Sequence, residues 1–409
     1  MKKILAIVLA VVMALGLAAC NGTNGDDANK KHKIGVATVH SGENWEIAKT
    51  YLDTVVAPAY NWEFVYSEVL SDANGLVAFM EQCFAAGCDG FINMVTSNDA
   101  ISQGAHKAQE WGMWFVTENS AYVEDVSTLS YNLGHVGAGP EAVGAAYKNA
   151  FANYLSDGQP HSVILFEGAA VGGDKGQGAA SHFYSASGVL EAFQEAYGLT
   201  YEAPIADLVN NQNPGEVKTG NPDVHIYLYP GRNPADAVTA LSPVLQSGTY
   251  DIFAAVFSFA AFTNAIDEVE KASGKDIKII GTAQIEKQTK TGFETKDSTG
   301  DTVLNSAILN DISVALGTKC IMLKHAFEGR ADAMKDNGKS VFMGVRSWAV
   351  NGAETYAKME KLNTTPDLYI LSKDQLEKYG KEGTTWKDLD KFLEDIADVD
   401  YLLKLKGMN

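Results

Sequence analysis

The feature that most constrains this chain is a repeated alternation between short apolar runs and longer segments with helical periodicity. The first unit, residues 33–60, places an apolar run before a polar turn and then a helix pattern. Short turns between strands and helices require parallel pairing with right-handed crossovers. The alternation therefore predicts an α/β fold. Within the first lobe, further strands are expected at 62–69, 88–95 and 113–117, and helices at 72–86 and 101–111.

The same alternation restarts after a glycine cluster at residues 134–139, which we interpret as a chain crossing or hinge before a helix. Pro140 suits the first turn of that helix, where its missing N–H costs nothing. The restart predicts a second doubly wound parallel-sheet lobe, with a cleft between the two lobes. Its strands are expected at 162–166, 224–229, 252–257 and 277–280.

The remaining chain is expected to cross between the lobes through a multi-stranded hinge. A strand at 302–309 and a helix at 312–328 are expected to return to the first lobe, and residues 340–350 to cross back. The polar insertion at 289–301 is typical of an exposed hairpin tip. The predicted organisation is an N-terminal lobe of 33–135 plus 302–340, a C-terminal lobe of 136–301 plus 341–363, and a C-terminal extension of surface helices over one lobe at 364–409.

The first nineteen residues have the order of parts expected of an export signal. Lys2 and Lys3 precede an apolar core, and small residues lead to Cys20. This ending is typical of a bacterial lipoprotein signal, in which Cys20 becomes the lipidated first residue; a plain secretory leader is the alternative. The polar residues 20–32 predict a flexible tether. We therefore expect an extracytoplasmic protein that is lipid-anchored to the bacterial cell membrane.

The charge balance excludes some partners. The chain has 51 acidic against 32 basic residues, a formal net charge of −19, which argues against nucleic acid or an anionic membrane surface as a partner. Solubility alone also explains such a balance. Cys83, Cys88 and Cys320 have no metal-ligand spacing, so we expect buried free thiols.

Catalytic motifs are missing from the sequence. There is no nucleophile elbow and no zinc-protease motif, and Lys175 in the glycine-rich stretch 167–178 lacks the spacing of a phosphate-binding loop. Carboxylates such as Glu43 and Glu167 could form an acid pair for glycoside cleavage, but each also suits hydrogen bonding in a binding cleft. We expect no enzyme activity, no metal and no cofactor.

Polar and aromatic residues follow the predicted strands, at the edge where open α/β sheets place their ligands. Trp45 has two interpretations: it stacks on a ligand, or it packs the helix start onto the sheet. His182 faces either the cleft or solvent, and Arg232 either clamps an anion or caps its turn. The candidate ligand-binding residues are His40, Asn44, Trp45, Asn98, Glu118, Asn119, Asp174, His182, Phe183, Arg232, Phe257, Ser258, Phe259 and Gln284.

Several of these segments carry a resemblance to a known family. The stretches KIGVATVHSGENWE, DGFINMV, MWFVTEN, HSVILFEG, YDIFAAVF and IKIIGTA resemble the type I periplasmic substrate-binding proteins of the ribose and galactose group. The resemblance spans residues 33–350 and depends on alternation and turn positions. It implies a monomer whose two lobes close on a small molecule, a carbohydrate first, and hand it to the permease of an ABC importer.

The resemblance also implies roles for single residues. Trp45 falls where sugar-binding members carry a stacking aromatic, and Glu118 with Asn119 falls where they carry an Asp-Arg pair, so the acid is kept and the arginine is lost. In the second lobe Phe257 and Ser258 replace a polar pair. Gln284 stands near a usual aspartate, and Ile308 replaces a hinge glutamine. The second lobe is therefore expected to add mainly apolar contact.

A second resemblance competes with the first. Residues 302–329 are similar to the corresponding strand and helix of the basic membrane protein family, nucleoside-binding lipoproteins of the same fold. The first loop lacks that family's Asp and Phe-Asn pattern, so this interpretation ranks second. A nucleoside ligand, and a sensor that presents its closed form to a membrane receptor, stay as alternatives.

Overall fold

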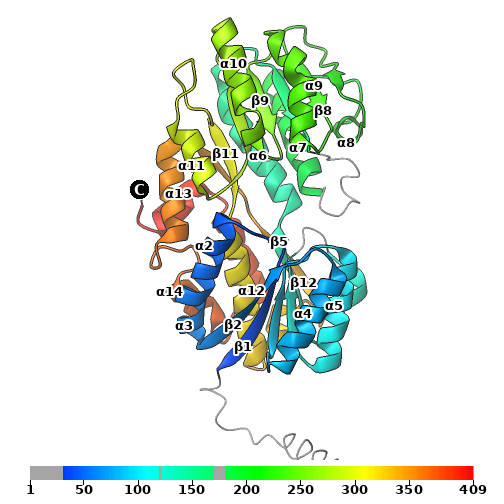
Figure 1. Cartoon of the computed structure of the whole chain (residues 1–409), viewed down its shortest axis with the longest axis vertical. Helices are drawn as coiled ribbons and strands as arrows, with labels where there is room; N and C mark the ends of the chain where they lie inside the picture. The colour runs from blue at the N-terminus through cyan, green and yellow to red at the C-terminus, as the bar shows by residue number, and fades with distance from the viewer. Residues whose placement is uncertain (1–30, 119–121, 169–179, 409) are drawn as a thin grey trace, which may run out of the picture.

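The molecule consists of two α/β lobes stacked along its long axis (Figure 1). The computed structural model describes residues 31–118, 122–168 and 180–408. Each lobe is built around one sheet, with six strands in the first and seven in the second. Within the described residues, no helix combines the length and the apolar character that a membrane crossing requires.

The first sheet is parallel throughout, as short strand–helix alternation demands. Its strands, in spatial order, are β12 (Val341–Val345), β5 (Asn132–Ala138), β4 (Trp114–Thr117), β3 (Gly90–Asn93), β1 (His32–Thr38) and β2 (Trp62–Val69). Its helices are α2 (Glu43–Tyr51), which continues through a π-helical segment (Leu52–Val56) into α3 (Ala57–Tyr60), then α4 (Ala73–Ala85), α5 (Asn98–Trp111) and α12 (Ile312–Phe327).

The second sheet is parallel except at its two edges, where β13 and β7 pair antiparallel with their neighbours. Its strands, in spatial order, are β13 (Trp348–Asn351), β11 (Ser306–Asn310), β10 (Lys278–Gln284), β9 (Ile252–Ala255), β6 (Val163–Phe166), β8 (Ile226–Tyr229) and β7 (Gly215–Val217). Its helices are α6 (Pro140–Tyr154), α7 (Ala180–Tyr197), α8 (Ile205–Val209), α9 (Pro234–Gln246), α10 (Thr263–Ser273) and α11 (Lys287–Glu294).

The C-terminal part of the chain is helical and connects both lobes. Its helices are α13 (Gly352–Thr364), α14 (Lys373–Gly380), α15 (Trp386–Asp395) and α16 (Val399–Leu405). Short 3-10 turns elsewhere are η4 (Glu124–Val126), η5 (Leu155–Asp157), η7 (Phe259–Ala261) and η8 (Ala331–Met334). The predicted α/β class with two sheets is confirmed, and the chain crosses between the lobes after β5, after β11 and between β12 and β13.

Two strands do not lie where the sequence analysis placed them. Strand β11 was expected in the first lobe with residues 302–340, but it pairs with β10 in the second sheet. Strand β12 was expected in the second lobe with residues 341–363, but it pairs with β5 in the first sheet. The crossings therefore fall near Asp311 and near Arg346. An apolar pattern predicts that a strand is buried, but it does not predict which of the two sheets the strand joins.

Strand β5 was expected as a glycine-rich crossing, and the glycines have a packing reason. Gly134 has φ +126°, and a Cβ atom at this position would lie 2.2 Å from the carbonyl oxygen of Val341 on β12. Only glycine allows β12 to approach β5 so closely. Pro140 begins α6, as predicted.

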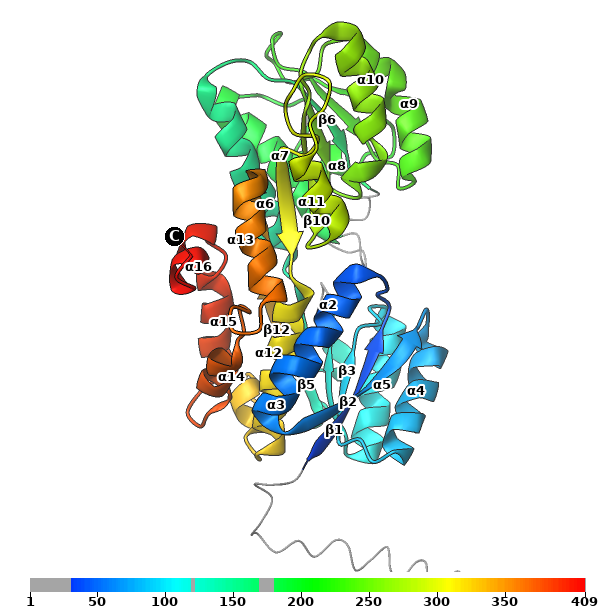
Figure 2. The same cartoon turned by 60° about the vertical axis from the view of Figure 1, so that its left-hand side comes forward.

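The polar insertion and the extension also differ from their predictions. Residues 289–294 of the predicted hairpin tip belong to helix α11 (Lys287–Glu294) instead. The rest of the insertion forms a hairpin, closed by an antiparallel bridge between Lys296 and Thr302. The extension covers both lobes rather than one: α14 packs on α12 of the first lobe, and α16 packs on β13 of the second. Figure 2 shows these helices along one side of the molecule. The buried Trp348 donates from Nε1 to the carbonyl oxygen of Ile396 at 2.6 Å, which joins β13 to the end of α15.

Candidate functional site

The carboxyl ends of the two sheets face each other at the waist of the molecule (Figures 1 and 2). Two direct hydrogen bonds cross between the facing loops. Asn44 donates from Nδ2 to Oε1 of Gln284 at 3.3 Å, and the backbone N–H of Lys287 donates to Oε2 of Glu43 at 2.9 Å. Asn44 and Gln284 were both predicted as site residues, and the structure brings them together from opposite lobes.

The first lobe presents a charged group at the end of β4. Glu118 lies 3.0 Å from Nζ of Lys319 through Oε2, and 3.7 Å from Nε2 of His40 through Oε1. The Lys319 side chain is fully buried, whereas Glu118 keeps 20% of its side-chain surface exposed. The ammonium group thus holds the carboxylate from behind, and the carboxylate keeps an open side.

The pKa of Glu118 reports the balance in this group. Burial by itself would raise the pKa, because it penalises the charged form, but the positive charge of Lys319 first, and the nearby His40 second, lower it to about 2. Glu118 is therefore ionised at any ordinary pH. An ionised carboxylate is a hydrogen-bond acceptor for hydroxyl groups.

The turn after β3 is held rigid beside this group. Asn93 donates from Nδ2 to Oγ1 of Thr117 at 2.9 Å and accepts from the N–H of Val95 at 2.9 Å. Asn98, a predicted site residue at the start of α5, has a buried Oδ1 with no hydrogen-bond partner in the part of the chain that the structure describes. This oxygen therefore keeps an unused hydrogen-bonding capacity at the start of α5.

The second lobe presents aromatic rings where the first presents charges. His182 donates from Nδ1 to the carbonyl oxygen of Gly168 at 2.7 Å, and its ring centroid lies 5.5 Å from that of Phe257. Burial, together with the positive charge of Arg232, lowers the pKa of His182. The imidazole is therefore neutral, and the predicted trio of His182, Arg232 and Phe257 lies together at this edge.

The predicted run of Phe257, Ser258 and Phe259 divides between surface and core. Phe257 is half-buried and Ser258 is exposed with φ +53°. Phe259 is buried, and a Cβ atom on Gly281 would lie 2.8 Å from its Cβ atom. The first two residues stay available to a ligand, whereas Phe259 packs against β10.

A second carboxyl group follows β6, and no cation among the described residues pairs with it as Lys319 pairs with Glu118. Glu167 is fully buried, and neither of its carboxylate oxygens has a hydrogen-bond partner among the described residues. Burial raises the pKa of Glu167 well above its ordinary value. The Glu167 carboxyl group therefore keeps its proton to a higher pH than an exposed glutamate does.

Two predicted contacts are corrected by burial. Trp45 is 5% exposed and packs edge-to-face on Tyr66 at 6.0 Å, so the packing interpretation applies and stacking on a ligand does not. Phe183 lies in the core of the second lobe beside Tyr184. Both side chains point inward because their helices bury the face on which they lie. Asn119, Asp174 and Cys20 lie outside the described residues.

Some residues of this region were missing from the predicted set. Lys319 lies in the middle of α12, where every neighbouring residue of the helix is buried, whereas Lys324 lies in the last turn. A charged residue inside an apolar stretch was the available signal, because a buried ammonium requires a partner. Glu43 and Glu167 were noted as carboxylates only.

One group of side chains in the second lobe has the spacing of metal ligands. Glu270, Asp276 and Asp297 offer oxygen atoms that lie within 4.8 Å of one another. Nζ of Lys278 lies 2.5 Å from Oδ2 of Asp276 and neutralises part of the negative charge of this group. The group lies at the opposite end of β10 from the facing loops, so it belongs to the lobe's own packing.

No protein-family model matches the sequence, and no curated protein matches it significantly. Solved structures share its fold. A solute-binding protein of an ABC transporter from Actinobacillus succinogenes, with bound D-allose, has a TM-score of 0.53 at 15% identity and covers 80% of this chain and 99% of its own. One from Bacillus halodurans with bound myo-inositol has a TM-score of 0.52 at 15% identity, covering 82% and 99%.

A glucose-galactose binding protein from Geobacillus stearothermophilus has a TM-score of 0.51 at 12% identity, and covers 79% of this chain and 98% of its own. At such identities the likeness establishes the fold. The chain has the two-lobe fold of periplasmic solute-binding proteins, as the sequence resemblance implied.

Proposed function

We propose that the chain is an extracytoplasmic solute-binding protein, not an enzyme, which captures a small polyhydroxylated ligand, a sugar first, between its lobes and delivers it to the permease of an ABC importer. The supporting observation is that two parallel sheets point their carboxyl ends at each other, with polar and aromatic side chains on the facing loops. Ligands of open α/β sheets bind at such edges. We further propose a monomer anchored through a lipid on Cys20.

The two walls suit the two sides of a sugar. Glu118 is an ionised acceptor for hydroxyl groups, and His40 lies beside it. Phe257 offers a half-exposed ring to an apolar face. Asn98 adds an unpaired acceptor. Asn119 and Asp174 stay proposed contacts from the sequence alone.

Closure follows from the connections between the lobes. The chain passes between them at three points, so the lobes can rotate about the crossings while each sheet stays intact. A ligand that touches both walls binds the closed state better and shifts the population toward it. The solved structures of this fold with bound D-allose and myo-inositol are named as ABC transporter solute-binding proteins, which supports a sugar or polyol and an importer.

A thermal-shift screen tests this function. The panel contains D-allose, myo-inositol, galactose, ribose and several nucleosides. Because a ligand that binds only the folded state stabilises it by RT ln(1 + [L]/Kd), a concentration of 100 Kd adds about 2.7 kcal/mol. We expect a sugar or polyol to raise the melting temperature, and Phe257→Ala to weaken that response. Phe84→Ala, which changes an exposed phenylalanine of the first lobe, is the matched control.

Other results would replace the proposal. A shift with nucleosides alone would assign the chain to nucleoside binding. No shift with any solute, together with hydrolysis of a glycoside, would contradict a binding function altogether. Permease and ATPase genes beside this one would support import, and a kinase or chemoreceptor gene would support sensing.

A further inference from the structure

Helix α2 of the first lobe reaches the second lobe with two consecutive residues. Glu43 accepts a hydrogen bond from the backbone N–H of Lys287 at 2.9 Å. Asn44 donates to Gln284 at 3.3 Å. One bond ends on the last residue of β10 and the other on the first residue of α11, so they form one connection between the lobes on the side where α11 lies.

The Lys287 N–H is a donor that α11 cannot satisfy itself. Lys287 is the first residue of α11, and the first four N–H groups of a helix have no partner within it. A side chain just before the helix usually accepts from them, but Glu286 at the cap position makes no side-chain hydrogen bond of this kind. The carboxylate that caps α11 comes instead from the other lobe.

The surroundings hold both partners in place. Gly42 precedes Glu43 with φ +81° and makes the turn from which α2 begins. The backbone of Glu286 is clamped by Tyr356 of α13, whose hydroxyl accepts from the Glu286 N–H at 3.1 Å and donates to its carbonyl oxygen at 3.0 Å. The donor is therefore positioned by α11 and α13, and the acceptor by the turn that begins α2.

We propose that Glu43 is a closure latch: a positioning residue that holds the lobes together by capping α11, without touching the ligand. The inference builds on the proposed function, because a latch has meaning only for lobes that open. The cap joins the lobes in the arrangement that the structure shows, and it is lost when the lobes separate. Glu43 thereby sets the closed population of the ligand-free protein, and affinity for every ligand scales with that population.

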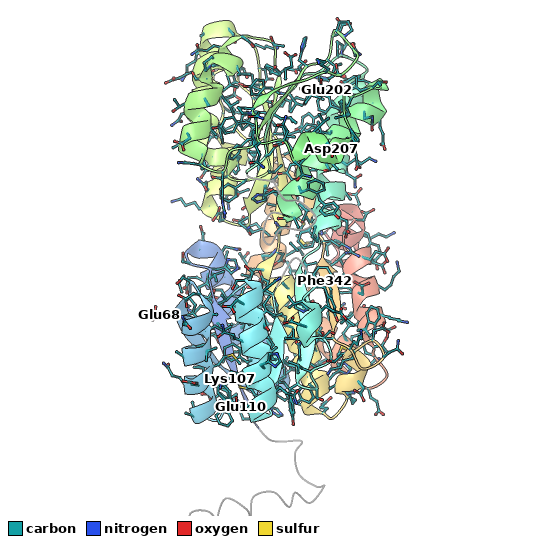
Figure 3. The ribbon with its side chains drawn as sticks, turned by 90° about the vertical axis from the view of Figure 1, so that its right-hand side faces the viewer. Glu68, Lys107, Glu110, Glu202, Asp207 and Phe342 are labelled. Carbon is teal, nitrogen blue, oxygen red and sulfur yellow. The ribbon has the colours of Figure 1, made fainter. Side chains whose placement is uncertain are left out.

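The test measures the distance between the lobes without any ligand. Pulsed electron paramagnetic resonance measures this distance between two spin labels. The labels are attached at Glu68→Cys on the first lobe and Asp207→Cys on the second, both exposed positions that are marked in Figure 3. A Cys20→Ser background restricts labelling to these two sites, because Cys83, Cys88 and Cys320 are buried. Two variants remove the same bond from opposite lobes: Glu43→Ala deletes the acceptor, and Lys287→Pro deletes the donor.

Proline is compatible with the first position of a helix, and Glu286 before it has the extended backbone that a following proline requires. We expect each variant to lower the ratio of closed to open molecules by about three- to tenfold, the net size of one ordinary hydrogen bond, because this bond is exposed to solvent. The double variant should open no further than either single variant, because both remove one bond.

Matched controls separate the latch from other effects. Glu46→Ala removes a neighbouring exposed carboxylate of α2, and Lys287→Ala removes the lysine side chain but keeps its N–H; both should match the parent. Parent-like distances in Glu43→Ala or in Lys287→Pro would overturn the latch. So would additive opening in the double variant. Because no ligand is present, this result is independent of the thermal-shift screen, and failure of either leaves the other readable.

Discussion

Glu118 and Glu167 each lie directly after an interior strand, β4 of the first sheet and β6 of the second, yet their environments differ. Glu118 lies against Lys319 and His40, and its pKa is lowered to about 2. Glu167 is buried without a partner among the described residues, and its pKa is raised. Similar lobes thus hold one carboxyl group charged and shift the other toward its neutral form.

The difference comes from what packs behind each sheet. Helix α12 enters the first lobe from the hinge and brings Lys319 under the end of β4, whereas no described cation lies against Glu167. Desolvation acts on both carboxyl groups, and only the first has a charge that outweighs it. The charged wall suits hydroxyl groups, and the neutral wall with Phe257 suits an apolar face.

The largest expected effect comes from breaking the ion pair between Lys319 and Glu118 in the first lobe. Lys319→Met removes the partner of Glu118 and leaves a largely buried carboxylate uncompensated, so we expect a loss of about 3–5 kcal/mol in the free energy of unfolding. Chemical denaturation measures it. Lys324→Met on the same helix, whose partner Glu328 lies near the surface, should cost no more than about 1 kcal/mol. Equal losses would show that the helix, rather than the ion pair, is sensitive.

The next effect tests which lobe supplies the aromatic contact. Trp45 is packed on Tyr66 in the first lobe, so Trp45→Ala should lower the free energy of unfolding by about 3 kcal/mol, near the lower end for a buried tryptophan. Calorimetry with a ligand from the thermal-shift screen should give an unchanged affinity. A weaker affinity with an unchanged melting temperature would return the Trp45 ring to the binding site.

The smallest effect has a size that depends on pH. Because the folded state raises the pKa of Glu167, its contribution to stability is full below the ordinary glutamate pKa of about 4.3 and is lost as the pH rises. Glu167→Gln removes that loss and should stabilise the protein by about 1–3 kcal/mol at pH 7. The gain should vanish below about pH 4, as unfolding curves across pH will show.

Glu118 predicts the opposite slope. Its pKa is lowered, so its contribution is present above about pH 4.3 and is lost as the pH falls toward 2. In Glu167→Gln this acid limb should persist. If Glu167→Gln abolished the loss of stability toward pH 2 as well as the loss at higher pH, the two carboxyl groups would be coupled. The contrast between the lobes would then fail.

Much of the fold was predictable because strand and helix periodicities are local. Strand β2 has the predicted bounds, and α4 begins after Asp72, whose side chain caps it by accepting from the N–H of Gly75. The site was predictable as an edge, since strand ends carry the ligand loops of such sheets. The inward turn of Trp45 was not, because its burial depends on Tyr66 from the next strand.

The sequence by itself determined the α/β class, the two lobes and the loops that meet at the waist, since these follow from periodicity, turn residues and strand order. Only the tertiary structure decided that β11 and β12 belong to opposite sheets from those expected, that Lys319 meets Glu118, and that Glu43 caps a helix of the other lobe. Each of these pairs residues far apart in the chain, and such contacts depend on how whole elements pack rather than on the pattern of any one segment.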